Sequence, residues 1–147
     1  MLALLGAGRA DAAATVAENL VRDSREGHSH DSRVAGETGA ATAQGIIAFR
    51  RGDYAEAARL LRLAAPHRIG AGGSNAQRDV FEQIALESLV RAGDFAQAET
   101  LLGQRLAARG GRNRFAARRL GRIASGREAS ARLGALLVVA SEPATHH

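Results

Sequence analysis

The chain has 147 residues and a formal net charge of +5, with 46% hydrophobic but only 3% aromatic residues. A chain of this length can bury a continuous core, and apolar residues that are mostly Ala and Leu favour close-packed helices over a sheet. The absence of Cys excludes disulfides, zinc–thiolate sites and thiol catalysis. We therefore predict an all-α fold.

The N-terminal run MLALLGAGRAD lacks a basic leader and is too short for a signal peptide. The apolar run LGALLVVA at 133–140 is also too short to span a membrane. These two observations predict a cytoplasmic protein with no membrane contact.

A repeat in the sequence predicts helical hairpins. The stretches GDYAEAARLL (52–61) and GDFAQAETLL (93–102) align without a gap, and GRADAAATVA (8–17) is a weaker third copy. In each copy a glycine (Gly8, Gly52 or Gly93) is expected to end one helix in a left-handed turn. Asp53 and Asp94 should then cap the next helix, and Glu56 and Gln97 should complete capping boxes.

Each repeat glycine is preceded by a predicted partner helix. TAQGIIAFRRG (42–52) has Gly45 as a small contact point, and DVFEQIALESLVRAG (79–93) has apolar residues at largely helical spacing. Between the helices, the sequence predicts long linkers at 23–36 and 65–74. In the hairpins, Tyr54 and Phe95 should fill the crease between paired helices, and the small Ala57 and Ala98 should let those helices approach closely.

The glycine-rich stretch IGAGGSNAQRDVF (69–81) has two interpretations. As a connector, it turns the chain back after Pro66 and starts a helix with Ser74 as cap and Gln77 three residues later. As a binding loop, its free N–H groups and arginines would hold an anionic ligand. A Walker loop is excluded because no Gly-Lys-Ser/Thr sequence occurs. The candidate contacts are Arg68, Ser74, Asn75, Gln77, Arg78 and Asp79.

The histidines do not predict a metal site. His28, His30 and Asp31 in EGHSHDSR have no third ligand at helical spacing, so we expect a solvated loop there. We also predict no cofactor and no catalytic residue.

All twenty basic residues are arginines, which is typical of a high-GC, bacterial-like composition. Residues 1–104 hold 11 Arg against 13 acidic residues, whereas residues 105–147 hold 9 Arg against 2. Phe115, Leu120 and Ile123 define the expected apolar side of a helix in the arginine cluster at 112–132. The cluster is interpreted as a solvated face, with an acidic partner protein or a nucleic-acid backbone as alternatives.

The hairpins resemble the tetratricopeptide repeat (TPR), whose consensus carries a small residue, then Gly-x-Tyr-x-x-Ala, then an apolar residue and a later Pro. The residues at these positions are Gly45, Gly52, Tyr54, Ala57, Leu61, Ala64 and Pro66 in one copy, and Gly93, Phe95, Ala98 and Leu102 in the other. The usual Trp of the first helix is absent, and the period exceeds the usual length of about 34 residues.

A narrower resemblance is to the tetratricopeptide repeat protein 38 family. HRIGAGGSNAQRDVFEQ (67–83) and GDFAQAETLLGQRL (93–106) are similar to late repeats of that family, in which a Gly-Gly-Ser-His-Ala-Gln-Arg-Asp run has His where this chain has Asn75. The resemblance covers roughly residues 1–125. It implies the C-terminal part of a longer solenoid with no established catalytic activity.

We accordingly expect an α-solenoid fragment of six or seven helices, with TPR-like hairpins over residues 1–125 and a capping helix, around 127–140, and disordered tail over 126–147. The first helices of the hairpins should form a groove that binds a segment of another protein. Exposed positions on those helices are the predicted contacts: Gln44, Ala48, Arg51, Gln83 and Glu87.

The short segment ahead of Gly8 lacks most of a first helix, which predicts that the chain is a fragment of a longer protein. An apolar edge at Leu2, Leu4 and Leu5 would then be exposed, and a homodimer could form through it. Binding of an anionic ligand at the GGSNAQRD stretch and nucleic-acid binding through residues 112–132 are the two alternative functions.

Overall fold

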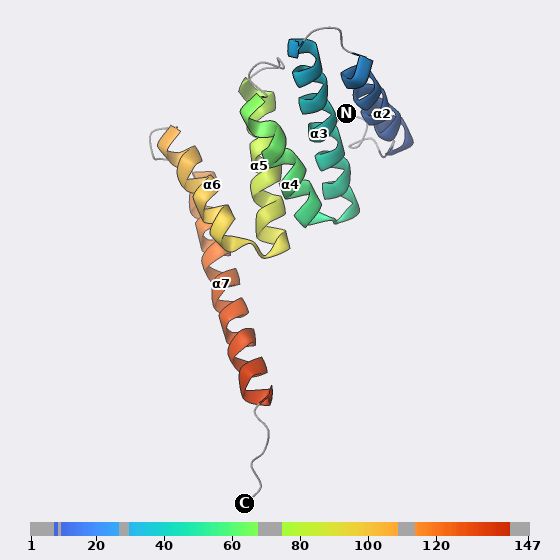
Figure 1. The fold of residues 1–147 in the computed structure, drawn as a ribbon. Coiled ribbons are helices and arrows are strands. Elements are labelled where there is room, and N and C mark those ends of the chain that lie inside the picture. The colour runs from blue at the N-terminus through green and yellow to red at the C-terminus, as the bar shows by residue number, and fades with distance from the viewer. Residues whose placement is uncertain (1–7, 9, 27–29, 68–74, 109–113, 142–147) are drawn as a thin grey trace, which may run out of the picture. The chain divides into compact units, whose positions relative to one another are not determined.

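The computed structural model describes residues 8, 10–26, 30–67, 75–108 and 114–141. Over these residues the chain is entirely helical, with six α-helices and a short 3-10 turn and no strand, which confirms the predicted all-α class. The helices, labelled as in Figure 1, are α2 (Ala10–Glu26), α3 (His30–Arg51), α4 (Tyr54–Ala64), α5 (Asn75–Ala92), α6 (Phe95–Ala108) and α7 (Arg114–Ser141), with the 3-10 turn η1 at Ala65–His67.

The chain divides into two compact units, Met1–Ala92 (the first unit) and Gly93–His147 (the second unit). The expected boundary between residues 125 and 126 lies inside α7, which runs without a break from Arg114 to Ser141. The expected separate helix around 127–140 is therefore the second half of a 28-residue helix. No helix over the described residues is both long and apolar enough to cross a bilayer.

Helix α3 is the centre of the first unit. It packs against both α2 and α4, and α4 also packs against α5. The contact between α3 and α4 is very close, because a Cβ atom placed on Gly45 would lie 2.8 Å from Leu61 Cγ. Gly45, predicted as a small contact point, therefore permits this approach, and Leu61 is completely buried against it.

The core of the first unit consists mostly of small and aliphatic side chains, as the composition predicts. Its buried apolar residues are Ala17, Ala40, Ala43, Ile46, Ala48, Ala57, Ala58, Leu60, Leu61, Ala64, Ala85, Leu86, Leu89 and Val90. The hydroxyls buried among them bond to carbonyls one turn earlier in their own helix: Thr38 to Val34 (2.7 Å), Thr42 to Thr38 (2.8 Å) and Ser88 to Ile84 (2.7 Å). These bonds satisfy donors that would otherwise destabilise the core.

The three repeat glycines adopt the left-handed conformation that the sequence predicts. Their φ angles are 75° at Gly8, 84° at Gly52 and 78° at Gly93. Among described residues other than glycine, none has a positive φ. Because a side chain is strained in this region, glycine is the residue that these turns require.

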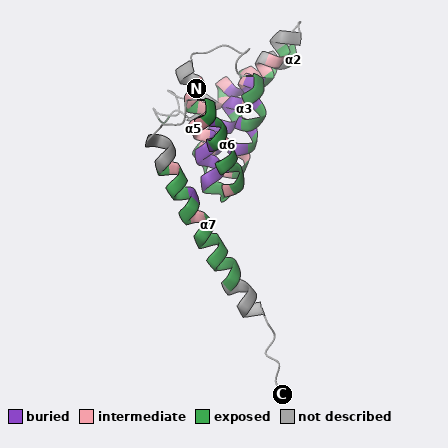
Figure 2. Ribbon diagram, turned by 90° about the vertical axis from the view of Figure 1, so that its left-hand side faces the viewer, coloured by how far each residue is buried: buried purple, intermediate pink, exposed green. Residues whose placement is uncertain are grey.

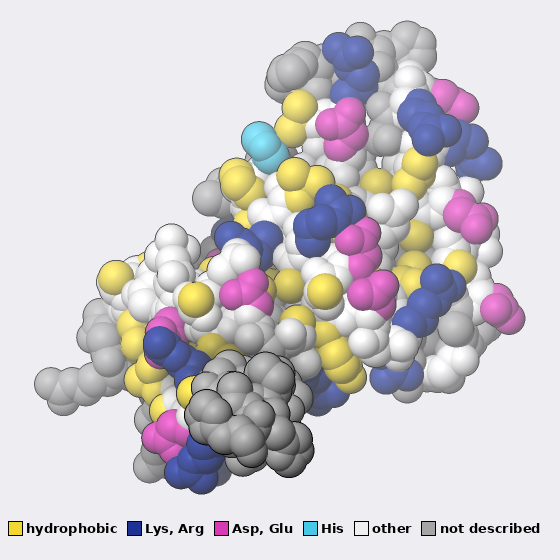
Figure 3. All heavy atoms as spheres, turned by 60° about the horizontal axis from the view of Figure 1, so that its bottom comes forward, with side chains coloured by type: hydrophobic (Ala, Val, Ile, Leu, Met, Phe, Trp, Pro, Cys, Tyr) yellow, Lys and Arg dark blue, Asp and Glu magenta, His cyan; other side chains and the backbone are white. Residues whose placement is uncertain are grey.

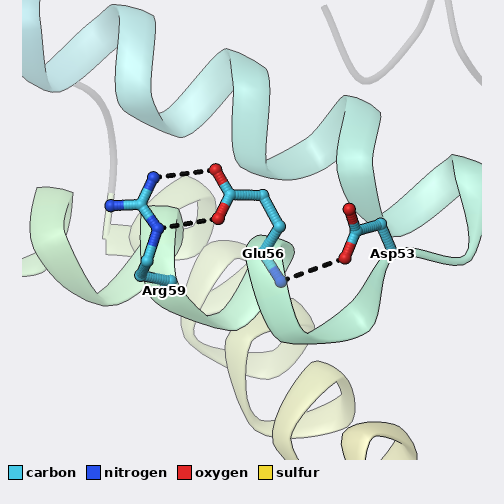
Figure 4. Close-up of polar contacts among 3 residues, drawn as sticks. All are labelled: Asp53, Glu56 and Arg59. Atoms are coloured by element: carbon cyan, nitrogen blue, oxygen red, sulfur yellow. Dashed lines mark hydrogen bonds and ion pairs between the residues drawn. The ribbon is translucent and has the colours of Figure 1, made fainter.

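The predicted N-caps Asp53 and Asp94 are confirmed, and the predicted capping box of Asp53 and Glu56 is not. The backbone N–H of Glu56 donates to Asp53 Oδ1 at 3.2 Å, and the N–H of Gln97 donates to Asp94 Oδ1 at 3.2 Å. The carboxylate of Glu56 turns instead to Arg59, as Figure 4 shows. In a capping box the Glu56 carboxylate would accept the Asp53 N–H. That N–H already donates to the Ala48 carbonyl at 3.0 Å, so the box does not form.

The predicted linker at 23–36 is wrong. Helix α2 continues to Glu26, and α3 begins at His30, so polar residues at both ends of this stretch are helical. The stretch contains no proline and no consecutive glycines, so its polarity alone does not interrupt a helix. Helix α3 is therefore 22 residues long, twelve residues longer at its N-terminus than the segment 42–52 predicted from the repeat.

The second unit is a helix pair with a small core. Ala98, Leu102 and Ile123 are completely buried, and Phe95 occupies the space beside Gly126, where a Cβ atom would overlap its ring. The expected apolar side of the 112–132 helix is only partly correct, since Leu120 is 46% exposed. The side chain of Phe115 lies outside the described residues. Figure 2 shows that α7 is exposed over most of its described length.

Candidate functional site: a hollow over helix α3

A hollow of about 530 Å³ lies over α3 in the first unit. We call it the α3 hollow. Helix α3 forms its floor, because α3 packs against both α2 and α4 and lies between them in Figure 1. The lining residues are Ala14, Ala17, Glu18 and Val21 from α2, Gln44, Ile47, Ala48 and Arg51 from α3, and Asp53, Glu56 and Leu60 at and after the start of α4.

Each helix presents one face to the hollow. The four α2 positions and the four α3 positions both follow the spacing i, i+3, i+4, i+7, which places their side chains on a single stripe of a helix. The α4 positions 56 and 60 are one turn apart, and Asp53 caps the same helix. The hollow is therefore formed by regular helices, whose spacing places these side chains on its walls and floor.

The bottom and the rim of the hollow differ in chemistry. Apolar side chains line the bottom, and among them Ala17, Ala48 and Leu60 are buried while Val21 and Ile47 are half-buried. The charged lining residues are Glu18 on the α2 wall, Asp53 and Glu56 on the α4 wall, and Arg51 at the end of the floor. Arg51 and, through its pairing with Glu56, Arg59 offset these three carboxylates in part, which leaves the rim with a small net negative charge.

The carboxylates of the α4 wall are held in place by local bonds. Asp53 accepts the Glu56 N–H, and Glu56 accepts two hydrogen bonds from Arg59, both 2.7 Å long (Figure 4). The hydrogen bonds from Arg59, helped by its positive charge, lower the pKa of the Glu56 carboxyl from its ordinary value, although burial opposes them. Glu56 therefore stays ionised at neutral pH, but its charge is balanced by Arg59, and Asp53 gives this wall its net negative charge.

This arrangement combines an apolar surface with charged groups. Among the described residues, its charged side chains are the carboxylates of Glu18, Asp53 and Glu56 and the guanidinium of Arg51. It offers an apolar bottom for an aliphatic group and carboxylates for a cation beside it. Its volume is within the range of ligand-binding clefts, roughly 300–1,000 Å³.

Three of the five predicted groove positions line the hollow, namely Gln44, Ala48 and Arg51. Gln44 and Arg51 are exposed as expected, but Ala48 is only 8% exposed because it belongs to the apolar bottom. That any of them contacts a partner stays a prediction.

The other two predicted groove positions, on α5, do not reach the hollow. Glu87 is only 7% exposed, so the expectation of an exposed side chain is wrong there too. Its carboxylate pairs with Arg91 at 2.7 Å, which compensates for its burial. Gln83 is half-buried and donates to Asp79 Oδ2 at 2.8 Å. Both side chains are thus engaged within α5 itself.

The GGSNAQRD stretch is only partly described. Arg68 and Ser74 lie outside the described residues, while Asn75 and Gln77 are in the first turn of α5. Helix α5 begins where the connector interpretation places a helix start. Arg78 and Asp79 are half-buried in that helix. Binding of an anionic ligand at this stretch stays a prediction.

The predicted loop around the histidines is wrong in part, because His30 and Asp31 form the first turn of α3. His28 lies outside the described residues. Among the residues that the structure describes, no three His, Asp or Glu side chains are grouped so that they could hold a metal ion.

The arginines of the 112–132 cluster do not all face solvent. Arg118 and Arg122 are exposed, whereas Arg119 is half-buried on α7, where burial and the neighbouring Arg122 lower the pKa of its guanidinium. An arginine starts from so high a pKa that it keeps its charge. On the face seen in Figure 3, arginines alternate with acidic side chains and do not form a continuous basic surface.

Sequence reasoning missed several lining residues of the hollow: Ala14, Ala17, Glu18, Val21, Ile47, Asp53, Glu56 and Leu60. The signal for the α2 wall was present as the stripe 14, 17, 18, 21. From the sequence, the lining residues Asp53 and Glu56 were interpreted only as parts of the N-terminal cap of a helix. A residue at a helix start can serve both the cap and the adjacent surface.

No protein-family model matches this chain, and no solved structure matches it.

Proposed function

We propose that this chain is a non-catalytic, TPR-like interaction scaffold of the cytoplasm, and that its α3 hollow binds a segment of another protein. The observation that carries the proposal is the hollow itself: an apolar bottom on one helical face, with charged residues at its rim. A helix or extended segment can place aliphatic side chains on that bottom while its polar groups stay in water.

The repeated turn supports the TPR-like part of the proposal. The Ala57 N–H donates to the Asp53 carbonyl at 3.0 Å, and the Ala98 N–H donates to the Asp94 carbonyl at the same distance. Together with the positive φ of Gly52 and Gly93 and the two aspartate caps, this makes the two turns locally equivalent. Turns that repeat in this way are typical of helical-repeat proteins, in which each repeat is one supersecondary unit.

Site-specific photo-crosslinking in cells tests the proposal. A photoreactive amino acid replaces Gln44, which is exposed and lines the hollow, and in the control it replaces Glu37, which is exposed on the same helix but does not line it. We expect position 44 to crosslink defined segments of other proteins that position 37 does not. The crosslinked segments, made as peptides, should then bind the purified protein and shift the NMR signals of hollow residues.

The positive charge of Arg51, at the end of the floor, gives a second test with the same peptides. Reversing this charge should change their affinity for the protein. Arg51→Glu alters the rim while leaving the fold intact, because Arg51 is exposed. Arg33→Glu, also exposed on α3 but outside the lining, makes the same change in net charge. Equal labelling at positions 44 and 37, or peptide affinities that neither variant changes, would contradict the proposed function.

A further inference from the structure

Helix α7 extends beyond the helix that covers it. Phe95, the first residue of α6, lies against Gly126 of α7. The turn just before α6, at Gly93 and Asp94, faces Arg127, Ser130 and Ala131 across a shallow hollow. Helix α6 therefore covers α7 no further than about residue 131, yet α7 continues to Ser141. We call residues 132–141 the α7 overhang; at 1.5 Å per residue it is about 15 Å long.

The face of α7 that packs against α6 continues into the overhang. Positions 123, 126, 130 and 133 follow the three- and four-residue spacing of one helical stripe. Ile123 is completely buried on this stripe, whereas Leu133 is 60% exposed. The sequence of the overhang, RLGALLVVAS, is otherwise mostly aliphatic or small. Leu133 is thus an apolar residue on this face of α7 that α6 leaves uncovered.

Arginines lie on both flanks of this stripe. Each residue turns the helix by about 100°, so Arg127 and Arg132 fall on opposite sides of the line through 126, 130 and 133. Arg127 pairs with Glu99 of α6 at 2.7 Å. Arg132 is exposed at the start of the overhang. The overhang is thus an aliphatic helix with a positive charge at its edge.

The α3 hollow has the complementary chemistry. Its bottom is aliphatic, and each wall has a carboxylate: Glu18 on α2 and Asp53 at the start of α4, beside Glu56, which is already paired with Arg59. Charge is also distributed unequally between the two units, with the excess of arginine in the unit that carries the overhang. The first unit holds 11 Arg and 11 acidic residues, whereas the second unit holds 9 Arg and 4 acidic residues.

We propose that the α3 hollow of one copy of this chain binds the α7 overhang of a second copy. The aliphatic stripe around Leu133 would cover the bottom of the hollow, and Arg132 would face its acidic walls. The inference rests on the proposed function, because it uses the same hollow as the binding surface. The overhang of a second copy is the occupant of the hollow that charge complementarity and the exposed Leu133 favour.

A charge-swap experiment on the full chain tests this inference. The variants Glu18→Arg and Arg132→Glu each place like charges across the proposed interface, so we expect each alone to weaken self-association about tenfold or more in sedimentation equilibrium. An equimolar mixture of the two variants should associate nearly as well as the wild type, since each hollow then meets an overhang of opposite charge. Circular dichroism verifies that both variants are folded.

Two matched controls carry the same changes of net charge elsewhere. Glu37→Arg alters an exposed residue outside the hollow, and Arg118→Glu alters an exposed residue of α7 outside the overhang. We expect both to associate like the wild type. Controls that weaken association equally, or a mixture of Glu18→Arg and Arg132→Glu that stays monomeric, overturn the inference.

The outcome for the wild type separates this inference from the proposed function. A wild-type chain that is monomeric at all concentrations, but still crosslinks other proteins at position 44, overturns the inference and leaves the proposed function in place. A monomeric chain with no specific crosslinks at that position overturns both.

Discussion

Arg91 joins three helix ends of the first unit. Its guanidinium lies over the rings of Phe49 (5.4 Å from the ring centroid) and Tyr54 (5.1 Å). It also donates to the Tyr54 hydroxyl at 2.9 Å and to Glu87 at 2.7 Å. The two rings themselves pack edge-to-face at 5.5 Å. A planar group with several donors is needed for this set of contacts, and arginine provides it where lysine does not.

Substitutions of Arg91 and Tyr54 should therefore separate the contribution of the planar shape of the guanidinium from that of its charge. We expect Arg91→Lys to lower the free energy of unfolding by about 1–2 kcal/mol, although the charge is kept, because the stacking and the bond to Tyr54 are lost. Tyr54→Phe removes only the hydroxyl and should cost about 0.5–1.5 kcal/mol. Urea unfolding followed by circular dichroism measures both. The double variant should cost less than the sum, and strict additivity would show that the two groups do not interact.

The pair of Glu56 and Arg59 gives a prediction about pH. Because hydrogen bonding to Arg59 lowers the pKa of Glu56 in the folded protein, the pair stabilises the fold above the ordinary glutamate pKa. That contribution is lost as the pH falls through the lowered folded-state pKa. Carboxyl ¹³C NMR should show Glu56 titrating below the ordinary range, and Arg59→Gln should move its titration back up. Arg62→Gln, on the same helix, is the control; an unmoved Glu56 titration in Arg59→Gln would contradict the assigned cause.

At the scale of helices, the sequence predicted turns better than helix lengths. A left-handed glycine followed by an aspartate cap depends on a few adjacent residues, so the repeat at Gly52 and Gly93 was sufficient to predict it. The N-terminal extension of α3 has no such local signal. Its polar residues from His30 are helical because nothing interrupts the helix and because residues such as Thr38 and Ala40 pack in the core. Packing against other helices is not visible in a local pattern.

The close contact of α3 and α4 predicts opposite effects for two glycine substitutions in the same helix. Gly45→Ala places a methyl group 2.8 Å from the buried Leu61 Cγ, so we expect a loss of about 1–2 kcal/mol despite the better helix propensity of alanine. Gly39→Ala meets the two methyl carbons of Leu20 at ordinary distances of 3.6 and 3.9 Å, and should gain about 0.5–1 kcal/mol.

Tyr54 fluorescence is a suitable probe for this comparison. The chain has one Tyr and no Trp, and Tyr54 is the first residue of α4, the helix that packs against Gly45. Its signal during urea unfolding therefore reports on the first unit. Equal stability of the Gly45→Ala and Gly39→Ala variants would mean that α3 and α4 separate easily, contrary to the tight packing described above.

At the scale of the whole molecule, the candidate site was predicted in part. The floor of the hollow was found from the repeat, because Gln44, Ala48 and Arg51 lie on one stripe of the helix that precedes Gly52. Its α2 wall was missed, because the weak first copy around Gly8 gave no reason to pair that helix with the floor. A surface made by several helices depends on which stripes meet, and this information is distributed over the whole chain.

Hydrogen exchange should show how protection varies over the molecule. We expect the slowest amides in α3 and α4, which together hold half of the buried residues over the described chain, and fast exchange in the α7 overhang in dilute solution. At high concentration the overhang amides should become protected if a second copy covers them, while those of α3 and α4 change little. Amides of residues 132–135 as slow as those of α3 in dilute solution would contradict the exposure of this part of α7.

The contact between Gly45 and Leu61 also constrains how this sequence can change over generations. A side chain at position 45 would occupy space that the isobutyl group of Leu61 now fills, so such a change requires a smaller residue at position 61 or a wider spacing of α3 and α4. Wider spacing would also shift the floor of the α3 hollow relative to its α4 wall. Positions 45 and 61 are therefore expected to covary among related sequences, and a relative with both residues altered should have a hollow of different shape and different binding preference.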